Sequence, residues 1–279
     1  MPSFDFRQVD VFAPAPLTGN PVAVVHDADA LSDEQMQSFA RWTNLSETTF
    51  LLAPTERGAD YRLRIFTPGG ELPFAGHPTL GSAHAWLEHG GAPARTDRVV
   101  QQCGIGTVEL RRDGARLAFR APDFLRSGPV EVDVMAAVVA TLGISSDQVV
   151  ASQWIDNGPG WIGVVLESAD EVLAVRPNYA SMGDLKIGVI GPHVAGGPAD
   201  YEVRAFAPGL AVVEDPVTGS LNAGFAVWLT RSGMAPANYT VRQGTVLGRR
   251  GDVSIATDEA GDLWVGGAST TLISGTLAL

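Results

Sequence analysis

Three side chains that could carry or hold a proton stand in short, distinctive motifs. Glu47 is the single charged residue between Thr43 and Ala53, His77 opens His-Pro-Thr-Leu-Gly-Ser, and Asp215 opens Asp-Pro-Val-Thr-Gly-Ser. A carboxyl and an imidazole are the groups that general acid–base catalysis uses most. Each also has an ordinary interpretation, since a lone glutamate at a helix-to-strand junction is commonly exposed and Asp-Pro is a favoured helix start.

The His77 and Asp215 motifs belong to an internal repeat with a spacing of about 140 residues. Residues 64–69 (Arg-Ile-Phe-Thr-Pro-Gly) match residues 204–209 (Arg-Ala-Phe-Ala-Pro-Gly), and both copies end in a Trp-Leu pair. Two ordered matches at nearly one spacing indicate a duplication. We therefore expect two similar halves in which His77 and Asp215 occupy equivalent, facing positions, with ligands held where two such halves meet.

The elements that must position these residues follow from local patterns. Residues 61–66 alternate polar and apolar side chains as a half-buried strand does, and residues 67–70 suit a type II turn. A helix is predicted from Gly81 to Glu88 in the first copy, with a matching apolar stripe in the second. An earlier helix is predicted over residues 33–42, with Ser32 as its N-cap and Gln35 as the partner in a capping box.

Composition restricts the class of protein and its partners. Of 279 residues, 45% are hydrophobic and 18% charged, which excludes a disordered chain. A net charge of −12 argues against nucleic-acid and anionic-membrane partners. The first residues lack an apolar signal core, and no apolar run approaches the roughly 20 residues of a membrane span, so a cytoplasmic location is expected. The single cysteine, Cys103, excludes an intrachain disulfide and two-thiol catalysis, and no metal-ligand spacing is visible.

Together these motifs resemble the PhzF-like isomerases of phenazine biosynthesis. The resemblance extends over nearly the whole chain and is carried by blocks at both ends and in both repeats: residues 9–12, 18–24, 44–48, 66–81, 214–220, 265–267 and 274–275. The long His-Pro-Thr and Glu-Asp-Pro blocks are its most specific parts.

The resemblance implies an α+β fold of the diaminopimelate epimerase type. Such a fold has two pseudo-symmetric halves, each a curved and mostly antiparallel sheet around a central helix. The expected N-terminal half is residues 1–122, completed by a C-terminal strand from about 266–279. The expected C-terminal half is residues 123–265.

The resemblance also implies roles for individual residues. Glu47 matches the general acid/base, while His77 and Asp215 complete the catalytic group and polarise the substrate. The backbone around Gly76 and Gly219, together with Ser220, matches the groups that bind the substrate carboxylate. The family implies a homodimer and no cofactor. Leu221 stands where the family more often has a small residue, and is expected to narrow the cleft.

The expected activity is therefore that of a cofactor-independent isomerase that moves a proton within a small carboxylic acid. Burial and the charge of Asp215 would raise the pKa of Glu47 from ~4.3 toward ~6–7, and a protonated His77 would offset Asp215. An epimerase or racemase of an amino or hydroxy acid is the alternative within enzymes, and needs a base on each face of the substrate. A non-catalytic protein that binds small acids is the alternative outside them.

Overall fold

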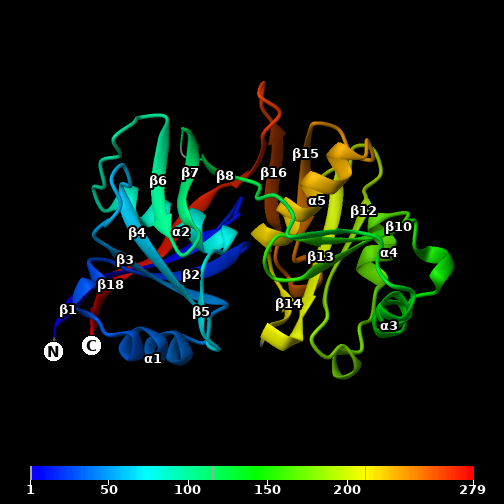
Figure 1. Cartoon of the computed structure of the whole chain (residues 1–279), viewed down its shortest axis with the longest axis horizontal. Coiled ribbons are helices and arrows are strands. Elements are labelled where there is room, and N and C mark those ends of the chain that lie inside the picture. The colour runs from blue at the N-terminus through cyan, green and yellow to red at the C-terminus, as the bar shows by residue number, and fades with distance from the viewer. Residues whose placement is uncertain (1, 115, 211) are drawn as a thin grey trace. The chain divides into compact units, whose positions relative to one another are not determined.

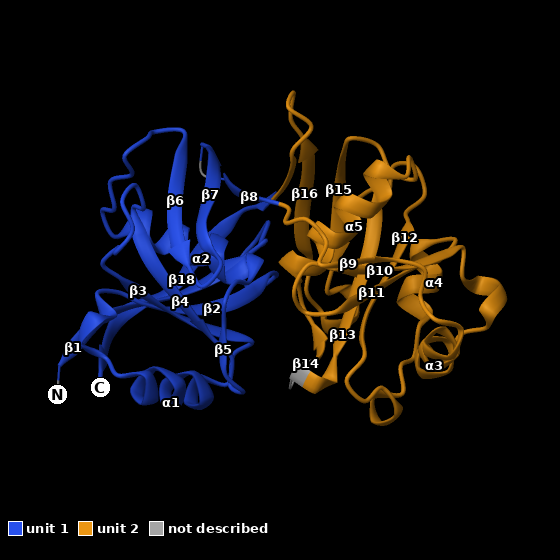
Figure 2. Cartoon of the chain, viewed as in Figure 1, with its two compact units in different colours: residues 1–120, 266–279 blue, residues 121–265 orange. Residues whose placement is uncertain are grey.

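The computed structural model describes residues 2–114, 116–210 and 212–279. The chain divides into two compact units, coloured separately in Figure 2. Unit 1 contains Met1–Arg120 and Gly266–Leu279, and unit 2 contains Ala121–Val265. Within the described residues, no helix is both long and apolar enough to cross a membrane.

Unit 1 is a sheet around one helix (Figure 1). Its strands are β1 (Ser3–Val11), β2 (Asn20–Val25), β3 (Glu47–Leu52), β4 (Tyr61–Phe66), β5 (Glu71–Leu72), β6 (Arg98–Cys103), β7 (Gly106–Asp113), β8 (Arg116–Arg120) and β18 (Ser269–Ala278). Neighbouring strands run antiparallel except for the parallel pairs β2–β3 and β4–β6. Helix α2 (Gly76–Glu88) contacts strands from β1 and β2 through to β8, so the sheet curves around it.

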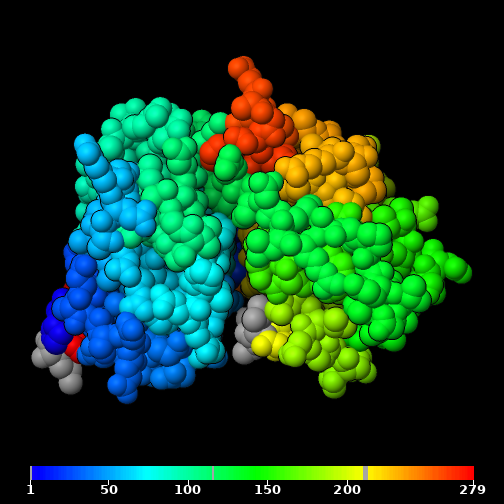
Figure 3. Space-filling view, viewed as in Figure 1, coloured from blue at the N-terminus to red at the C-terminus, as the bar shows by residue number. Residues whose placement is uncertain are grey.

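Helix α1 (Asp33–Thr43) packs on β3 and β4 and lies at the surface of unit 1 (Figure 3). Its apolar residues Met36 and Phe39 join Phe50 and Phe66 in one buried cluster. Ser32 accepts from the backbone N–H of Gln35, and the Gln35 side chain accepts from the backbone of Ser32. The predicted helix and its capping box are confirmed.

Unit 2 repeats this arrangement. Its strands are β9 (Arg126–Gly128), β10 (Ala151–Asp156), β11 (Trp161–Val165), β12 (Lys186–Pro192), β13 (Tyr201–Ala207), β14 (Val212–Asp215), β15 (Asn238–Gln243), β16 (Gly251–Thr257) and, ending in unit 1, β17 (Leu263–Gly267). Helix α5 (Gly219–Arg231) is almost entirely buried against β10 and β11, whereas α3 (Val132–Leu142) and α4 (Ala169–Ala174) pack outside it.

The two units have the same strand pairing. In unit 2, β10–β11 is antiparallel, β11–β12 parallel, β12–β13 antiparallel and β13–β15 parallel, as β1–β2, β2–β3, β3–β4 and β4–β6 are in unit 1. The registers match as well, because Thr48 pairs with Phe66 where Ile187 pairs with Phe206. The duplication indicated by the sequence is therefore visible in the backbone.

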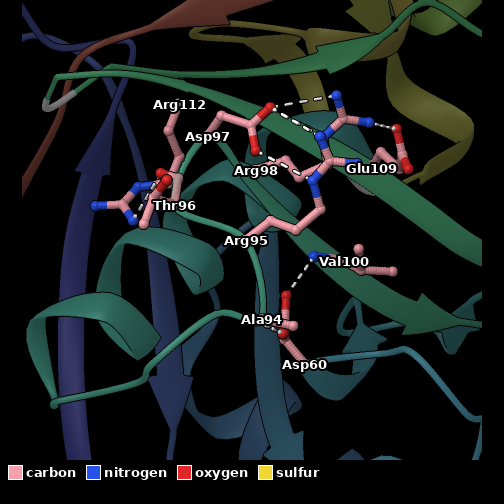
Figure 4. A network of polar contacts seen from close by, with 9 residues as sticks. All are labelled: Asp60, Ala94, Arg95, Thr96, Asp97, Arg98, Val100, Glu109 and Arg112. Atoms are coloured by element: carbon pink, nitrogen blue, oxygen red, sulfur yellow. Dashed lines mark hydrogen bonds and ion pairs between the residues drawn. The ribbon is translucent and has the colours of Figure 1, made fainter.

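A polar network fixes the segment that leads into β6 (Figure 4). The Asp60 carboxylate accepts from the backbone N–H groups of Ala94 and Val100, at 2.9 and 2.7 Å. On the outer face Arg98 pairs with both Asp97 and Glu109. Acidic partners thus accompany the arginines of this sheet face, which is typical of a solvated surface.

Candidate active site

Unit 1 brings Glu47 and His77 together. Glu47 is the first residue of β3, and His77 is the second residue of α2. The distance from Glu47 Oε2 to His77 Nδ1 is 3.4 Å, and the His77 side chain is only 4% exposed. A strand start and a helix start therefore place a carboxyl beside an imidazole, as acid–base chemistry requires.

His77 is a neutral imidazole at physiological pH. Burial lowers its pKa from 6.5 to about 3, although a hydrogen bond with the backbone of Pro21 acts in the opposite direction. The expectation that a protonated His77 offsets the charge of Asp215 is therefore wrong. The contact with Glu47 is therefore one between a carboxyl and a neutral ring, 3.4 Å apart, and not an ion pair.

The start of α2 leaves backbone donors for a ligand. Its N-cap residue is Ala75, which has no side-chain acceptor, whereas α1 begins with the capping hydroxyl of Ser32. The first N–H groups of a helix have no intrahelical partner and attract anions. Strand β6 stabilises this helix start, because Gln101 Nε2 donates a hydrogen bond to Thr79 Oγ1 at 3.0 Å.

Unit 2 places Asp215 at the end of β14, before the helix rather than in it. Its Oδ2 atom accepts from Thr218 Oγ1 at 2.6 Å, and its backbone oxygen accepts from Gln243 Nε2 at 3.0 Å. Helix α5 begins at Gly219, so the Thr218 hydroxyl is directed to Asp215 and does not cap the helix. Like α2, α5 starts without a side-chain cap.

The expected equivalence of His77 and Asp215 is wrong. The second residue of α5 is Ser220, and that position matches His77 in α2. The repeated Gly-Ser pairs are the sixth and seventh residues of α2 but the first and second residues of α5. Gly81 packs closely on Val22 within α2, and the glycine that packs on a strand in the same way in α5 is Gly224. For the same reason, α2 begins five residues before the predicted position.

The hydroxyl of Ser220 is bound by a residue that the sequence analysis missed. Trp161 Nε1 donates to Ser220 Oγ at 3.0 Å, and Asn157 Nδ2 donates to the Ser220 backbone oxygen at 2.8 Å. Asn157 lies in the β10–β11 connection and Trp161 is the first residue of β11, and both are far from Ser220 in the sequence. Both contacts join the β10–β11 region to helix α5, so no local pattern of the sequence indicates them.

Buried Gln243 was also missed. Its Oε1 atom accepts from the backbone N–H of Thr218 and from Asn222 Nδ2, at 3.0 and 2.8 Å. Gln243 thereby ties β15 to the start of α5, as Gln101 ties β6 to α2. Its polar side chain on an otherwise apolar strand face is the signal that the sequence offered.

Leu221 packs in the core of unit 2 instead of lining a cleft. It is fully buried, and its side chain fills the space over Gly188, where an added Cβ would collide with it. The expected narrowing of the cleft by Leu221 is wrong, because the side chain points to β12.

The remaining candidate ligands form no metal cluster within the described residues. Cys103 is partly buried, and burial raises the pKa of its thiol. Two units with the same strand pairing, each with a helix start that lacks a side-chain cap and one with a carboxyl beside an imidazole, have the groups that acid–base chemistry uses.

Comparison with known proteins identifies the family. Residues 9–275 match the family model described as "Phenazine biosynthesis-like protein". The chain is 39% identical to "Antisense-enhancing sequence 1" of Schizosaccharomyces pombe, over 99% of both chains. It is 37% identical to the "Trans-2,3-dihydro-3-hydroxyanthranilate isomerase" of Pseudomonas aeruginosa, over 91% of this chain and 90% of that one. The chain belongs to the phenazine biosynthesis-like family.

A solved structure supports the same assignment. The PhzF-family protein of Enterococcus faecalis superimposes with a TM-score of 0.82 at 25% identity, over the full length of both chains. The predicted family and fold class are confirmed, and the isomerase names of the relatives confirm the predicted enzyme class.

Proposed function

We propose that this chain is a cofactor-independent isomerase that moves a proton within a small carboxylic acid. The observation that carries the proposal is the Glu47 carboxyl, 3.4 Å from the buried, neutral His77 at the uncapped start of α2. A carboxyl in such a place can accept a proton and return it, and the adjacent backbone N–H groups can stabilise negative charge on the substrate.

In the proposed reaction Glu47 starts as a carboxylate and takes a proton from one carbon of the substrate. The electron pair of the broken C–H bond passes into the conjugated system. The Glu47 carboxylic acid then returns the proton to a different carbon, and a double bond has moved. Protons and electrons balance without a co-reactant. General acid–base catalysis of this kind contributes typically 10²–10⁴-fold to the rate.

The other site residues bind and orient the acid. We assign His77 to hydrogen bonding of the substrate as a neutral ring, and Asp215 to a substrate donor such as an amino or hydroxyl group. The helix starts at Gly76 and Gly219, with Ser220, supply donors for the carboxylate. These assignments rest on the uncapped helix starts and on the family's pattern at these positions.

The relative from Pseudomonas aeruginosa is named for trans-2,3-dihydro-3-hydroxyanthranilate, a cyclic amino acid with a conjugated carboxylate. We propose an acid of this class as the substrate here. Its carboxylate suits the helix starts, and its amino and hydroxyl groups suit Asp215.

The test is proton NMR in D₂O with trans-2,3-dihydro-3-hydroxyanthranilate and a panel of cyclic and acyclic amino acids. We expect a double bond to migrate in at least one acid with wild-type protein and no migration with Glu47→Gln. Deuterium entering with inversion at a stereocentre would instead establish an epimerase. Acids that raise the melting temperature but never exchange a proton would establish a binding protein.

We further propose that the protein is a homodimer located in the cytoplasm. The proposal rests on the family and on the sequence features described above. Sedimentation at several protein concentrations tests the dimer, and a single species at the mass of one chain would contradict it. Fractionation of the producing cells tests the location.

A further inference from the structure

We propose that Trp161 is a positioning residue that fixes the Ser220 hydroxyl as a hydrogen-bond donor to a substrate carboxylate. The proposal rests on the proposed function, because it assigns a polarity to one contact of that site. It assigns the hydroxyl proton of Ser220 to a hydrogen bond with an acceptor oxygen of the ligand.

The indole of Trp161 determines the direction of its hydrogen bond with Ser220. An indole N–H can donate a hydrogen bond and cannot accept one. Since Trp161 Nε1 lies 3.0 Å from Ser220 Oγ, the hydroxyl oxygen must be the acceptor. The hydroxyl proton of Ser220 therefore points elsewhere. Among the residues that the structure describes, the indole is the partner recorded for this hydroxyl, so its proton remains for a ligand.

The surroundings of Trp161 and Ser220 hold both side chains in the geometry of this hydrogen bond. Trp161 is the first residue of β11 and is only 2% exposed, which fixes its ring in the core. Ser220 is partly exposed, and its backbone oxygen is bound by Asn157. The serine is thus immobilised from one side and reachable from the other.

The backbone N–H groups at the start of α5 are hydrogen-bond donors, as the Ser220 hydroxyl is. Ser220 is the second residue of the 13-residue helix α5, whose first N–H groups have no intrahelical acceptors. A serine donor and helix N–H groups together favour an anionic oxygen. The substrate group at Ser220 is therefore its carboxylate.

A matched control lies on the adjacent strand. Trp154 in β10 also donates its indole N–H to an oxygen, Glu131 Oε2, at 2.9 Å. Trp154→Phe removes the same kind of hydrogen bond from unit 2 without touching Ser220. Trp161→Phe retains an aromatic ring in the core and removes only the donor and part of the ring.

The experiment is a double-mutant cycle read by calorimetric titration with anthranilate. We expect Trp161→Phe to weaken binding about fivefold, as the loss of one hydrogen bond does, and Trp154→Phe to leave it unchanged. In a Ser220→Ala background, Trp161→Phe should add nothing further. In turnover assays KM should rise while kcat changes less than twofold.

Three results would overturn the proposal: equal weakening in the presence and absence of Ser220, no weakening at all, or no binding of anthranilate by the wild-type protein. If Trp161→Phe does not fold, ¹⁵N NMR of the indole groups replaces it. Ser220→Ala should then move the Trp161 resonance, and an unmoved resonance would contradict the contact. Since Glu47→Gln should still bind anthranilate, failure of the proton-transfer proposal is distinguishable from failure of this one.

Discussion

The two units share one strand order and differ in the side chains at equivalent positions. Glu47 pairs with Val22 across β2–β3, and Lys186 pairs with Trp161 across β11–β12, so Lys186 is the counterpart of Glu47. It is the single lysine of the chain. At the second helix position, His77 of unit 1 corresponds to Ser220 of unit 2. The two units therefore keep one framework and differ in the side chains that it carries, a carboxyl and an imidazole in unit 1 and a lysine and a serine in unit 2.

A second pair of equivalent residues shows the opposite pattern, in which chemistry is kept and burial differs. Arg64 binds Glu71 through two nitrogens, and Arg204 binds Glu214 in the same way. The side chains are 15% and 42% exposed in unit 1 but 3% and 4% exposed in unit 2. Because Glu214 precedes Asp215, the buried pair also fixes the strand that carries a site residue.

The largest expected effect is on turnover and comes from replacing Glu47, the residue that distinguishes unit 1 from unit 2 at this position. Glu47→Gln keeps the shape and removes the proton carrier, so turnover should fall by roughly 10²–10⁴-fold. Binding of anthranilate should change little. Steady-state kinetics and calorimetry check both statements, and turnover within tenfold of wild type would refute the assigned role.

Arg204→Met should have the next largest effect, this time on stability. It leaves Glu214 buried without its cation, a loss that typically costs about 3–5 kcal/mol. Arg64→Met, whose acidic partners reach solvent, should cost about 1 kcal/mol or less. Denaturant unfolding measures both, and equal losses would show that the difference in burial has no energetic consequence.

The pH dependence of stability should separate His77 from Ser220. Unfolded His77 binds a proton near pH 6.5, but the folded residue does so only near pH 3. Between these values the unfolded state holds more protons, so stability falls as the pH decreases, by about 1.4 kcal/mol per unit. His77→Gln should remove roughly 2 kcal/mol of this loss between pH 6.5 and 5.

Two controls show that a difference between the pH profiles comes from His77 alone. Ser220→Ala should have the same pH profile as wild type, because no titrating group is changed. His26, whose pKa burial lowers to about 4, contributes a loss of the same sign in all variants and cancels. Parallel profiles for wild type and His77→Gln would mean that His77 is not buried as a neutral ring.

The smallest expected effect concerns Lys186. Its ammonium group donates to the backbone oxygen of Asp184 at 3.4 Å, next to the strand that carries Trp161. A cation at this position should favour an anionic ligand, so Lys186→Gln should weaken anthranilate binding about threefold with kcat retained. Arg176→Gln removes the same charge from unit 2 and should have no effect. If both variants weaken anthranilate binding equally, the effect comes from the net charge of the protein and not from the position of Lys186.

Much of the fold was predictable because the signals are local or repeated. The Ser32 capping box is confirmed, and the repeated Arg-x-Phe strands do occupy equivalent places in the two sheets. The family motifs identified the fold class without any knowledge of strand order.

The errors arose where tertiary packing decides. Matching Gly-Ser pairs suggested that His77 and Asp215 are equivalent, but close packing of Gly81 and Gly224 sets the helix register instead. The charge state of His77 depends on complete burial, and the partner of Ser220 comes from the packing of strand β11 against helix α5. No local pattern encodes either. The site residues themselves remain predictions that the experiments above address.

A crystal structure with bound anthranilate tests the central claim most directly. We predict that the carboxylate accepts hydrogen bonds from the Ser220 hydroxyl and the start of α5, and that a ring carbon lies about 3–3.5 Å from the Glu47 carboxyl. A ligand whose amino group lies on Ser220, or whose ring lies far from Glu47, would contradict it.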